Sequence, residues 1–167
     1  MSARRMSLIA VLVLACACQR SPAPQTGSTT LPADTATQAA DSPDVAAGVL
    51  RAYYRAIDER RYGDAYHLWA SGGAASGKSL SAFSDGFGKT ASVAVSVGAP
   101  GAMEGAAGSR YIEIPVQIAA VMSDSTHQSY TGSYTLRRST VDGATADQHA
   151  WRIYAARIRR DVPPTKD

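Results

Sequence analysis

The spacing of apolar residues changes once along this chain, and that change limits the fold more than any single motif. From Val45 to Phe87 the apolar side chains recur every three or four residues, as on one face of a helix. From Ala91 onward they alternate with small or polar side chains, which is typical of half-buried strands. Helices that precede a run of strands predict one α+β domain, with the helices on one face of an antiparallel sheet.

Three helices are expected before the strands. The first should begin at Ser42, a favoured N-cap, because Pro43 suits the first helical position and Asp44 complements the helix dipole. The second is expected over residues 62–70, where the following Ser-Gly-Gly ends it, and the third over residues 79–89.

Four antiparallel strands are expected after the helices, over residues 91–97, 110–122, 127–138 and 150–159. The glycine-rich stretch 98–109 between the first two strands is expected to be a loop. In the second strand, Pro115 cannot donate a ladder hydrogen bond, so it predicts an edge or a bulge. The same strand places Glu113 opposite its isoleucines, so Glu113 should point outward if the aliphatic face packs on the helices.

Residues 1–15 have the pattern of an export signal. Arg4 and Arg5 precede an apolar stretch that is too short to span a hydrocarbon core of about 30 Å. Val13-Leu14-Ala15-Cys16 resembles the lipobox of bacterial lipoproteins, in which the signal is removed and the cysteine is lipidated. Cys18 is the alternative lipidation site, and soluble release after ordinary signal cleavage is a second alternative. The resemblance implies a membrane anchor in the bacterial cell envelope, and because Asp follows neither cysteine, the periplasmic face of the outer membrane is favoured.

A linker rich in Pro, Ala, Thr, Ser and Gln is expected over residues 16–42, beginning with the lipidated cysteine. Such a composition cannot bury enough apolar surface to offset the entropy of ordering, so we expect a disordered tether with a reach of roughly 25–30 Å. The domain is then expected over residues 43–162, and residues 163–167 are expected to be a disordered tail. Both cysteines precede the domain, which excludes a disulfide-stabilised fold.

The net charge of +3 does not indicate a nucleic-acid partner. Two of the positive charges, Arg4 and Arg5, would leave with the signal peptide, so the mature chain is nearly neutral. Arginine is frequent in the last two expected strands and just beyond them: Arg137, Arg138, Arg152, Arg157, Arg159 and Arg160. Solvated strand faces and protected sheet edges explain these residues, and an anionic partner such as phospholipid headgroups or cell-wall polymer is the alternative.

Two segments resemble the opening of nuclear-transport-factor-2-like (NTF2-like) domains: Tyr53-Tyr54-Arg55-Ala56-Ile57 on the first helix, and Tyr62-Gly63-Asp64-Ala65-Tyr66 at the start of the second. Residues 132–137 and Trp151-Arg152-Ile153 resemble the late strands of the same fold. The resemblance spans residues 44–160. It implies three helices packed on a curved four-stranded antiparallel sheet, shaped as a cone with an inner cavity. It also implies that a homodimer through the outer sheet face is one alternative.

Five aromatic side chains would converge if the helices cover the concave face of the sheet: Tyr53, Trp69, Phe83, Tyr134 and Trp151. They form a candidate pocket for an apolar or aromatic small ligand. The alternative is that the same five side chains simply form the hydrophobic core.

No catalytic, cofactor-binding or metal-binding pattern emerges from the sequence. His67, His127 and His149 are far apart and lack the spacing of a zinc site. Residues 71–79 contain the Gly-x-x-x-x-Gly-Lys-Ser spacing of a phosphate-binding loop, but a helix rather than a strand is expected before it. We therefore interpret this match as a chance occurrence in a Gly/Ser-rich loop.

Two functions stay open on this reading. The first is a lipid-anchored envelope protein whose non-catalytic domain binds a partner, such as another envelope protein. The second is a small-ligand carrier or a cavity enzyme of the isomerase or dehydratase kind, which would use the aromatic pocket. A converging acid–base pair in an open cavity would favour the enzyme, whereas a cavity filled by Tyr and Trp would favour the binding module.

Overall fold

The computed structural model describes residues 41–162. The expected signal peptide, Cys16, Cys18, most of the expected linker and the expected tail lie outside the described residues. The helices are α2 (Pro43–Asp58), α3 (Tyr62–His67), a 3-10 helix (Ser71–Ser76), α4 (Leu80–Gly86) and α5 (Ala146–His149). The strands are β1 (Thr90–Val97), β2 (Met103–Ala106), β3 (Ser109–Met122), β4 (His127–Ser139) and β5 (Arg152–Arg160).

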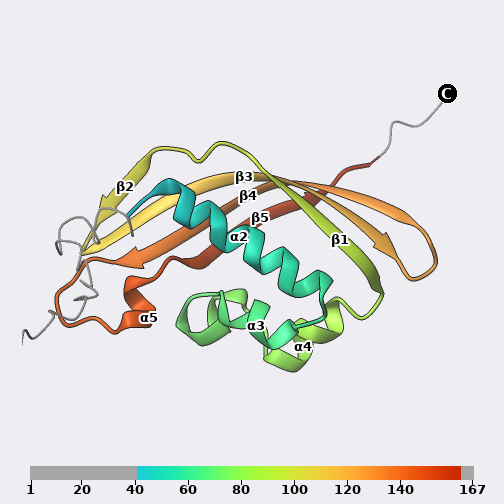
Figure 1. Cartoon of the computed structure of the whole chain (residues 1–167), viewed down its shortest axis with the longest axis horizontal. Coiled ribbons are helices and arrows are strands. Elements are labelled where there is room, and N and C mark those ends of the chain that lie inside the picture. Colours follow the sequence, from blue (N-terminus) through green and yellow to red (C-terminus); the bar gives the residue numbers. More distant parts are fainter. Residues whose placement is uncertain (1–40, 163–167) are drawn as a thin grey trace, which may run out of the picture. The chain divides into compact units, whose positions relative to one another are not determined.

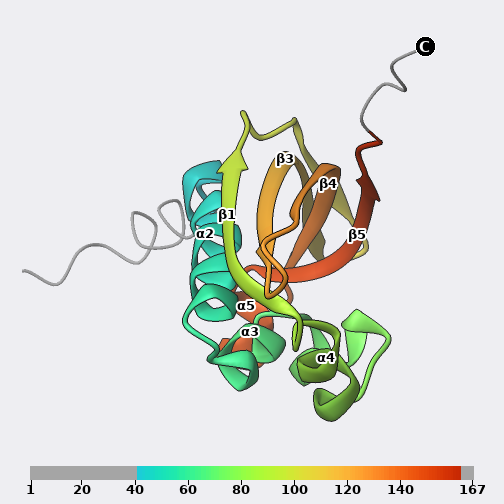
Figure 2. The same cartoon turned by 90° about the vertical axis from the view of Figure 1, so that its right-hand side faces the viewer.

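The strands form one curved antiparallel sheet in the order β1-β3-β4-β5, and β2 pairs with β3 on the same side as β1. The sheet arches over the helices, so α2 lies along its concave face (Figure 1). There α2 contacts β1, β3 and β5, and Figure 2 shows the same arrangement from the side. The predicted α+β fold with helices on one face of the sheet is confirmed.

The sheet has five strands, so the prediction of four strands is wrong. The additional strand, β2, lies within residues 98–109, which the sequence predicted to be a loop. A two-residue turn at Ala107 and Gly108 joins β2 to β3, with φ of 45° and 72°. Positive φ at both central positions is what a two-residue type I′ hairpin turn requires. The four residues of β2, Met-Glu-Gly-Ala, are too few to show an alternation of apolar and polar side chains, which is why the strand was missed.

Pro115 lies in the interior strand β3, between β4 and the β1–β2 side, so the predicted edge position is wrong. The Gly98 N–H donates to the Pro115 carbonyl at 2.9 Å, and the Gly101 N–H donates to the Glu113 carbonyl at 2.8 Å. In an antiparallel strand the nitrogen and carbonyl of one residue face the same neighbour. The missing N–H of Pro115 therefore faces the interruption between β1 and β2, where no regular ladder bond is lost.

The first helix begins where the sequence predicts. The Ser42 hydroxyl accepts a hydrogen bond from the Asp44 N–H at 3.2 Å, and Pro43 occupies the first turn. The aliphatic face of β3 is buried against the helices through its isoleucines and Val116. Glu113 is exposed on the other face, as that packing predicts, and accepts a hydrogen bond from the Ser133 hydroxyl at 2.5 Å.

The second and third helices are shorter than predicted. Helix α3 ends at His67 because Trp69 leaves the helix and forms a parallel bridge with Ile153 of β5. The Ile153 N–H donates to the Leu68 carbonyl at 2.9 Å, and the Ala70 N–H donates to the Ile153 carbonyl at 2.8 Å. These backbone bonds fix the helices to one edge of the sheet. Within residues 41–162, no helix combines the length and the apolar character that a membrane span requires.

Candidate functional site

Four of the five predicted aromatic residues meet around one ring, that of Tyr53 on α2. Its centroid lies 6.2 Å from that of Trp69, 6.3 Å from Phe83 and 6.1 Å from Tyr134. Trp151 is buried in the same core cluster. The rings are packed against each other mostly edge to face, the geometry that aromatic pairs prefer. Most of this set therefore fills the concave face of the sheet as hydrophobic core.

A cleft of about 280 Å³ adjoins this aromatic core on the concave face. Tyr53 and Tyr134 belong to its lining, whereas Trp69, Phe83 and Trp151 do not. The lining comes from α2, from the end of α4 and from all four long strands: Tyr53, Tyr54, Gly86, Phe87, Thr90, Val93, Ile118, Ala120, Met122, Tyr130, Tyr134 and Ile158. Sequence analysis missed ten of these twelve residues, although Val93 and the lining residues of β3 and β4 follow the apolar alternation that predicted those strands.

A pair of buried hydroxyl groups joins the two sides of this cleft. The hydroxyl oxygens of Tyr54 on α2 and Tyr134 on β4 are 2.7 Å apart, so one of the two groups donates to the other. The pair has two hydroxyl hydrogens and uses only one of them in this bond. Tyr54 and Tyr134 both belong to the lining, so the pair places hydroxyl groups among mostly apolar side chains.

Burial keeps these phenols protonated. Desolvation raises the pKa of Tyr53, Tyr54 and Tyr134 well above the ordinary value of 10, and the neighbouring Tyr134 further raises the pKa of Tyr53. The three groups therefore act as neutral hydrogen-bond donors and acceptors near neutral pH rather than as bases. The described lining contains no Asp, Glu, His, Lys or Arg that would pair with them as a proton carrier.

The histidines that the sequence singled out lie apart from this cleft. His67 ends α3 and His127 begins β4, and both are exposed. His149 ends α5, where its Nδ1 lies 3.0 Å from the Ser139 carbonyl oxygen. Across residues 41–162, no group of three or more His, Cys, Asp or Glu side chains is arranged to hold a metal ion.

The Gly-Lys-Ser segment has the wrong surroundings for a phosphate-binding loop. It contains the 3-10 helix that follows α3, and no strand leads into it. Gly73 has a φ of 104° and lies so close to the Tyr66 ring that a Cβ would be 2.0 Å from a ring carbon. The segment is therefore a tight connection between helices and not a loop from a strand to a helix, which agrees with a chance match to the motif.

Comparisons with known proteins give one similar structure. No family model matches the chain, and no curated protein is significantly similar to it in sequence. A solved structure of a nuclear transport factor 2 (NTF2-like) superfamily protein from Salmonella enterica serovar Typhimurium superposes with a TM-score of 0.47 and 16% sequence identity. The match covers 81% of this chain and 96% of that one. That protein belongs to the superfamily that the sequence resemblance names.

Proposed function

We propose that residues 41–162 form a non-catalytic binding domain for a small, largely apolar ligand that carries a hydrogen-bond acceptor. The observation that carries this proposal is the cleft of about 280 Å³ with the Tyr54–Tyr134 hydroxyl pair among its apolar side chains. Ligand sites of this kind combine apolar surface, which supplies affinity, with a few placed polar groups, which supply orientation. A ketone, ether or ester oxygen would accept the hydroxyl hydrogen that the tyrosine pair leaves unused.

A cavity enzyme is the less favoured function for the same cleft. An acid–base catalyst needs a group that gains and loses a proton near the working pH. The three buried phenols have pKa values raised above 10, so each keeps its proton at neutral pH. Proton abstraction by these phenols would need their ionisation, and the described lining contains no Asp, Glu or His side chain that would serve as the base instead.

The proposed ligand site can be tested with prodan, a neutral naphthyl ketone whose fluorescence depends on its surroundings. Ala120 is buried in the lining, and Ala119 is exposed on the outer face one residue before it. We expect prodan to bind a chain of residues 41–167, after circular dichroism has shown that this chain unfolds cooperatively. Ala120→Phe should fill the cleft and weaken binding about tenfold or more, whereas Ala119→Phe should leave it unchanged.

If Ala120→Phe and Ala119→Phe bind prodan equally well, the probe binds outside the cleft, which would contradict the proposal. Tyr54→Phe distinguishes the contribution of the hydroxyl pair from that of the apolar surface, because it removes a hydroxyl and keeps the ring. It should weaken binding of the ketone more than binding of the parent hydrocarbon, naphthalene. A uniform effect on both probes would mean that the hydroxyl pair does not contact the ligand.

We further propose that a lipid on Cys16 holds this domain at a bacterial envelope membrane, as the lipobox resemblance implies. In a bacterial host that is fed labelled palmitate, the full chain should incorporate the label and appear in the membrane fraction. Cys16→Ser should abolish the incorporation, whereas Cys18→Ser should retain it. The reverse pattern would assign the lipid to Cys18, and unlabelled wild-type protein in the soluble fraction would contradict anchoring altogether.

A further inference from the structure

A lysine lies beside the cleft that holds the two paired tyrosine hydroxyls, which we call the tyrosine cleft. Gly86, the last residue of α4, belongs to the lining of this cleft and is exposed, so it lies at the rim. Residues three apart on a helix share a face, and Phe83 of the same helix is buried in the core. A Cβ built on Gly86 would be 3.6 Å from the Lys78 Nζ atom. The Lys78 ammonium group is therefore next to the rim, although the lysine itself precedes α4.

The backbone of Lys78 is fixed by its neighbours. The Tyr66 hydroxyl donates to the Lys78 carbonyl at 2.9 Å, and the Lys78 N–H donates to the Ser76 hydroxyl oxygen at 3.3 Å. The next residue, Ser79, is the N-cap of α4, where its hydroxyl accepts from the Ala82 N–H at 3.2 Å. The side chain of Lys78 therefore starts from a defined point beside the helix that supplies the rim.

The end of α4 does not explain the position of this lysine. A lysine near a helix C-terminus commonly donates to the last carbonyl groups. Here the Ser84 carbonyl accepts from the Phe87 N–H at 3.0 Å, and the Asp85 carbonyl accepts from the Gly88 N–H at 3.1 Å. Within residues 41–162, the Lys78 ammonium group forms no ion pair, so its charge is uncompensated there.

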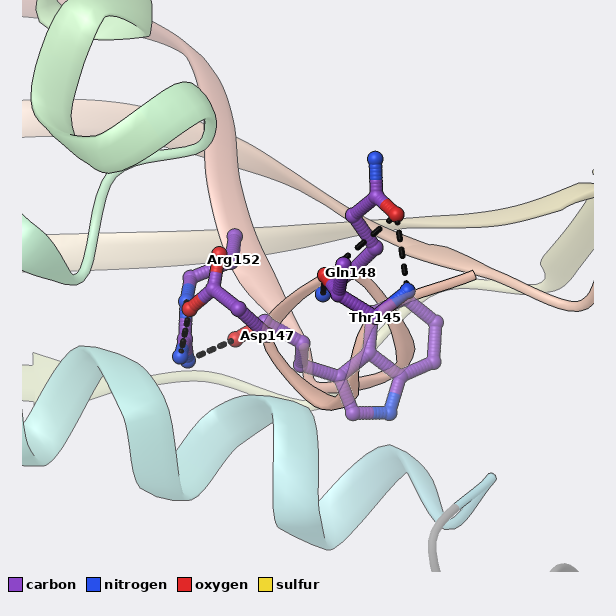
Figure 3. A network of polar contacts seen from close by, with 5 residues as sticks. Thr145, Asp147, Gln148 and Arg152 are labelled. Carbon is purple, nitrogen blue, oxygen red and sulfur yellow. Dashed lines mark hydrogen bonds and ion pairs between the residues drawn. The ribbon is translucent and has the colours of Figure 1, made fainter. Parts of the chain in front are cut away.

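Two arginines at the end of β4 and the start of β5 differ from Lys78, because each has a carboxylate partner. Arg152 donates to the Asp147 carboxylate through Nε at 2.9 Å and also through Nη2, as Figure 3 shows. Arg138 is 6% exposed and donates to the Asp41 carboxylate at 2.7 Å, so the prediction of a solvated position is wrong for it. Lys78 instead combines an exposed, uncompensated charge with a position beside an apolar cleft.

We infer that the tyrosine cleft takes an apolar carboxylic acid, whose hydrocarbon body fills the cleft and whose carboxylate lies at the rim beside Lys78. The inference rests on the proposed function, because it assigns a chemical class to the ligand of the same cleft. A carboxylate is costly to bury among apolar side chains, whereas at the exposed rim it keeps part of its hydration and meets an ammonium group. One uncompensated lysine balances one negative charge, which favours a carboxylate over a doubly charged phosphate monoester.

The test compares two probes that share one ring system, the anion naphthoate and the neutral methyl ketone acetylnaphthalene. Isothermal titration of the full chain in non-ionic detergent at low ionic strength measures both affinities, after the heat of each probe in protein-free detergent is subtracted. We expect Lys78→Gln to weaken naphthoate binding about three- to tenfold and to change ketone binding by less than about twofold. Lys78→Arg keeps the positive charge, so it should retain most of the affinity for naphthoate.

Arg159→Gln is the matched control, because it removes one positive charge from an exposed residue of β5 outside the lining. An equal loss of naphthoate affinity in this control would overturn the inference, and so would an equal loss of both probes in Lys78→Gln. If Ala120→Phe weakens ketone binding but naphthoate does not bind, or binds Lys78→Gln unchanged, the proposed function stands and only the inference fails. If Ala120→Phe changes the binding of neither probe, the proposed function fails and the inference fails with it.

Discussion

Replacing Leu136 with alanine is expected to lower the free energy of unfolding by about 2–5 kcal/mol. The side chain is 0% exposed and lies in the middle of the core, where its strand neighbours are Ile112 of β3 and Ile153 of β5. The substitution removes buried methyl groups and leaves a cavity that flanking strands cannot close, because both are fixed by the sheet register. Urea denaturation followed by circular dichroism measures the change.

Leu80→Ala is the matched control for this loss, because it makes the same chemical change at a side chain that is 42% exposed on α4. We expect it to change the free energy of unfolding by no more than about 0.5 kcal/mol. Similar losses for the two variants would contradict the assignment of Leu136 to the core. A large loss for Leu136 alone would agree with a core that lies between the sheet and α2.

Replacing Gly132 with alanine is expected to destabilise the domain by about 1–3 kcal/mol. Gly132 lies in β4 opposite Ile158 of β5, and a Cβ there would be 2.0 Å from the Arg157 carbonyl oxygen. That oxygen belongs to the β5 backbone, so the collision is relieved only when the two strands move apart. Because Ile158 lines the tyrosine cleft, the same variant should also weaken prodan binding.

Gly48→Ala is the control for this second prediction. Gly48 lies within α2, and a Cβ there meets no atom within 4 Å. Alanine has the higher helix propensity, so this variant should stabilise the domain by about 0.5–1 kcal/mol. If Gly132→Ala lowers the stability and Gly48→Ala raises it, the loss comes from the close approach of β4 and β5. It would then not be a general response to the added methyl group. A neutral Gly132→Ala would contradict that close approach.

Much of the fold could be predicted because local signals agreed with one another. The Ser42 cap, the helical spacing of α2 and the alternation of β1, β3 and β4 each predict the element that forms. Strand β2 could not be predicted in this way, since its pairing depends on positive φ at Ala107, a conformation that alanine rarely adopts. The early end of α3 depends on a bridge between Trp69 and Ile153, which are far apart in the sequence.

The candidate site was predictable only in part. Tyr53 and Tyr134 were identified as aromatic residues on faces that should meet, and both line the cleft. Tyr54 was missed because neighbouring residues of a helix point about 100° apart, so one apolar stripe does not include both tyrosines. Both are buried here, because both rings pack against Tyr134 of β4. The burial of Arg138 was not predicted, because an arginine in an alternating strand is ordinarily exposed.

The position of the ligand is tested most directly by intermolecular nuclear Overhauser effects between prodan and the methyl groups of the domain. Met122 and Val121 are adjacent in β3, but only Met122 lines the tyrosine cleft. We expect contacts from prodan to the methyl groups of Met122, Ile118 and Ile158, and none to Val121. Contacts that involve Val121 without these three residues would contradict the proposed site.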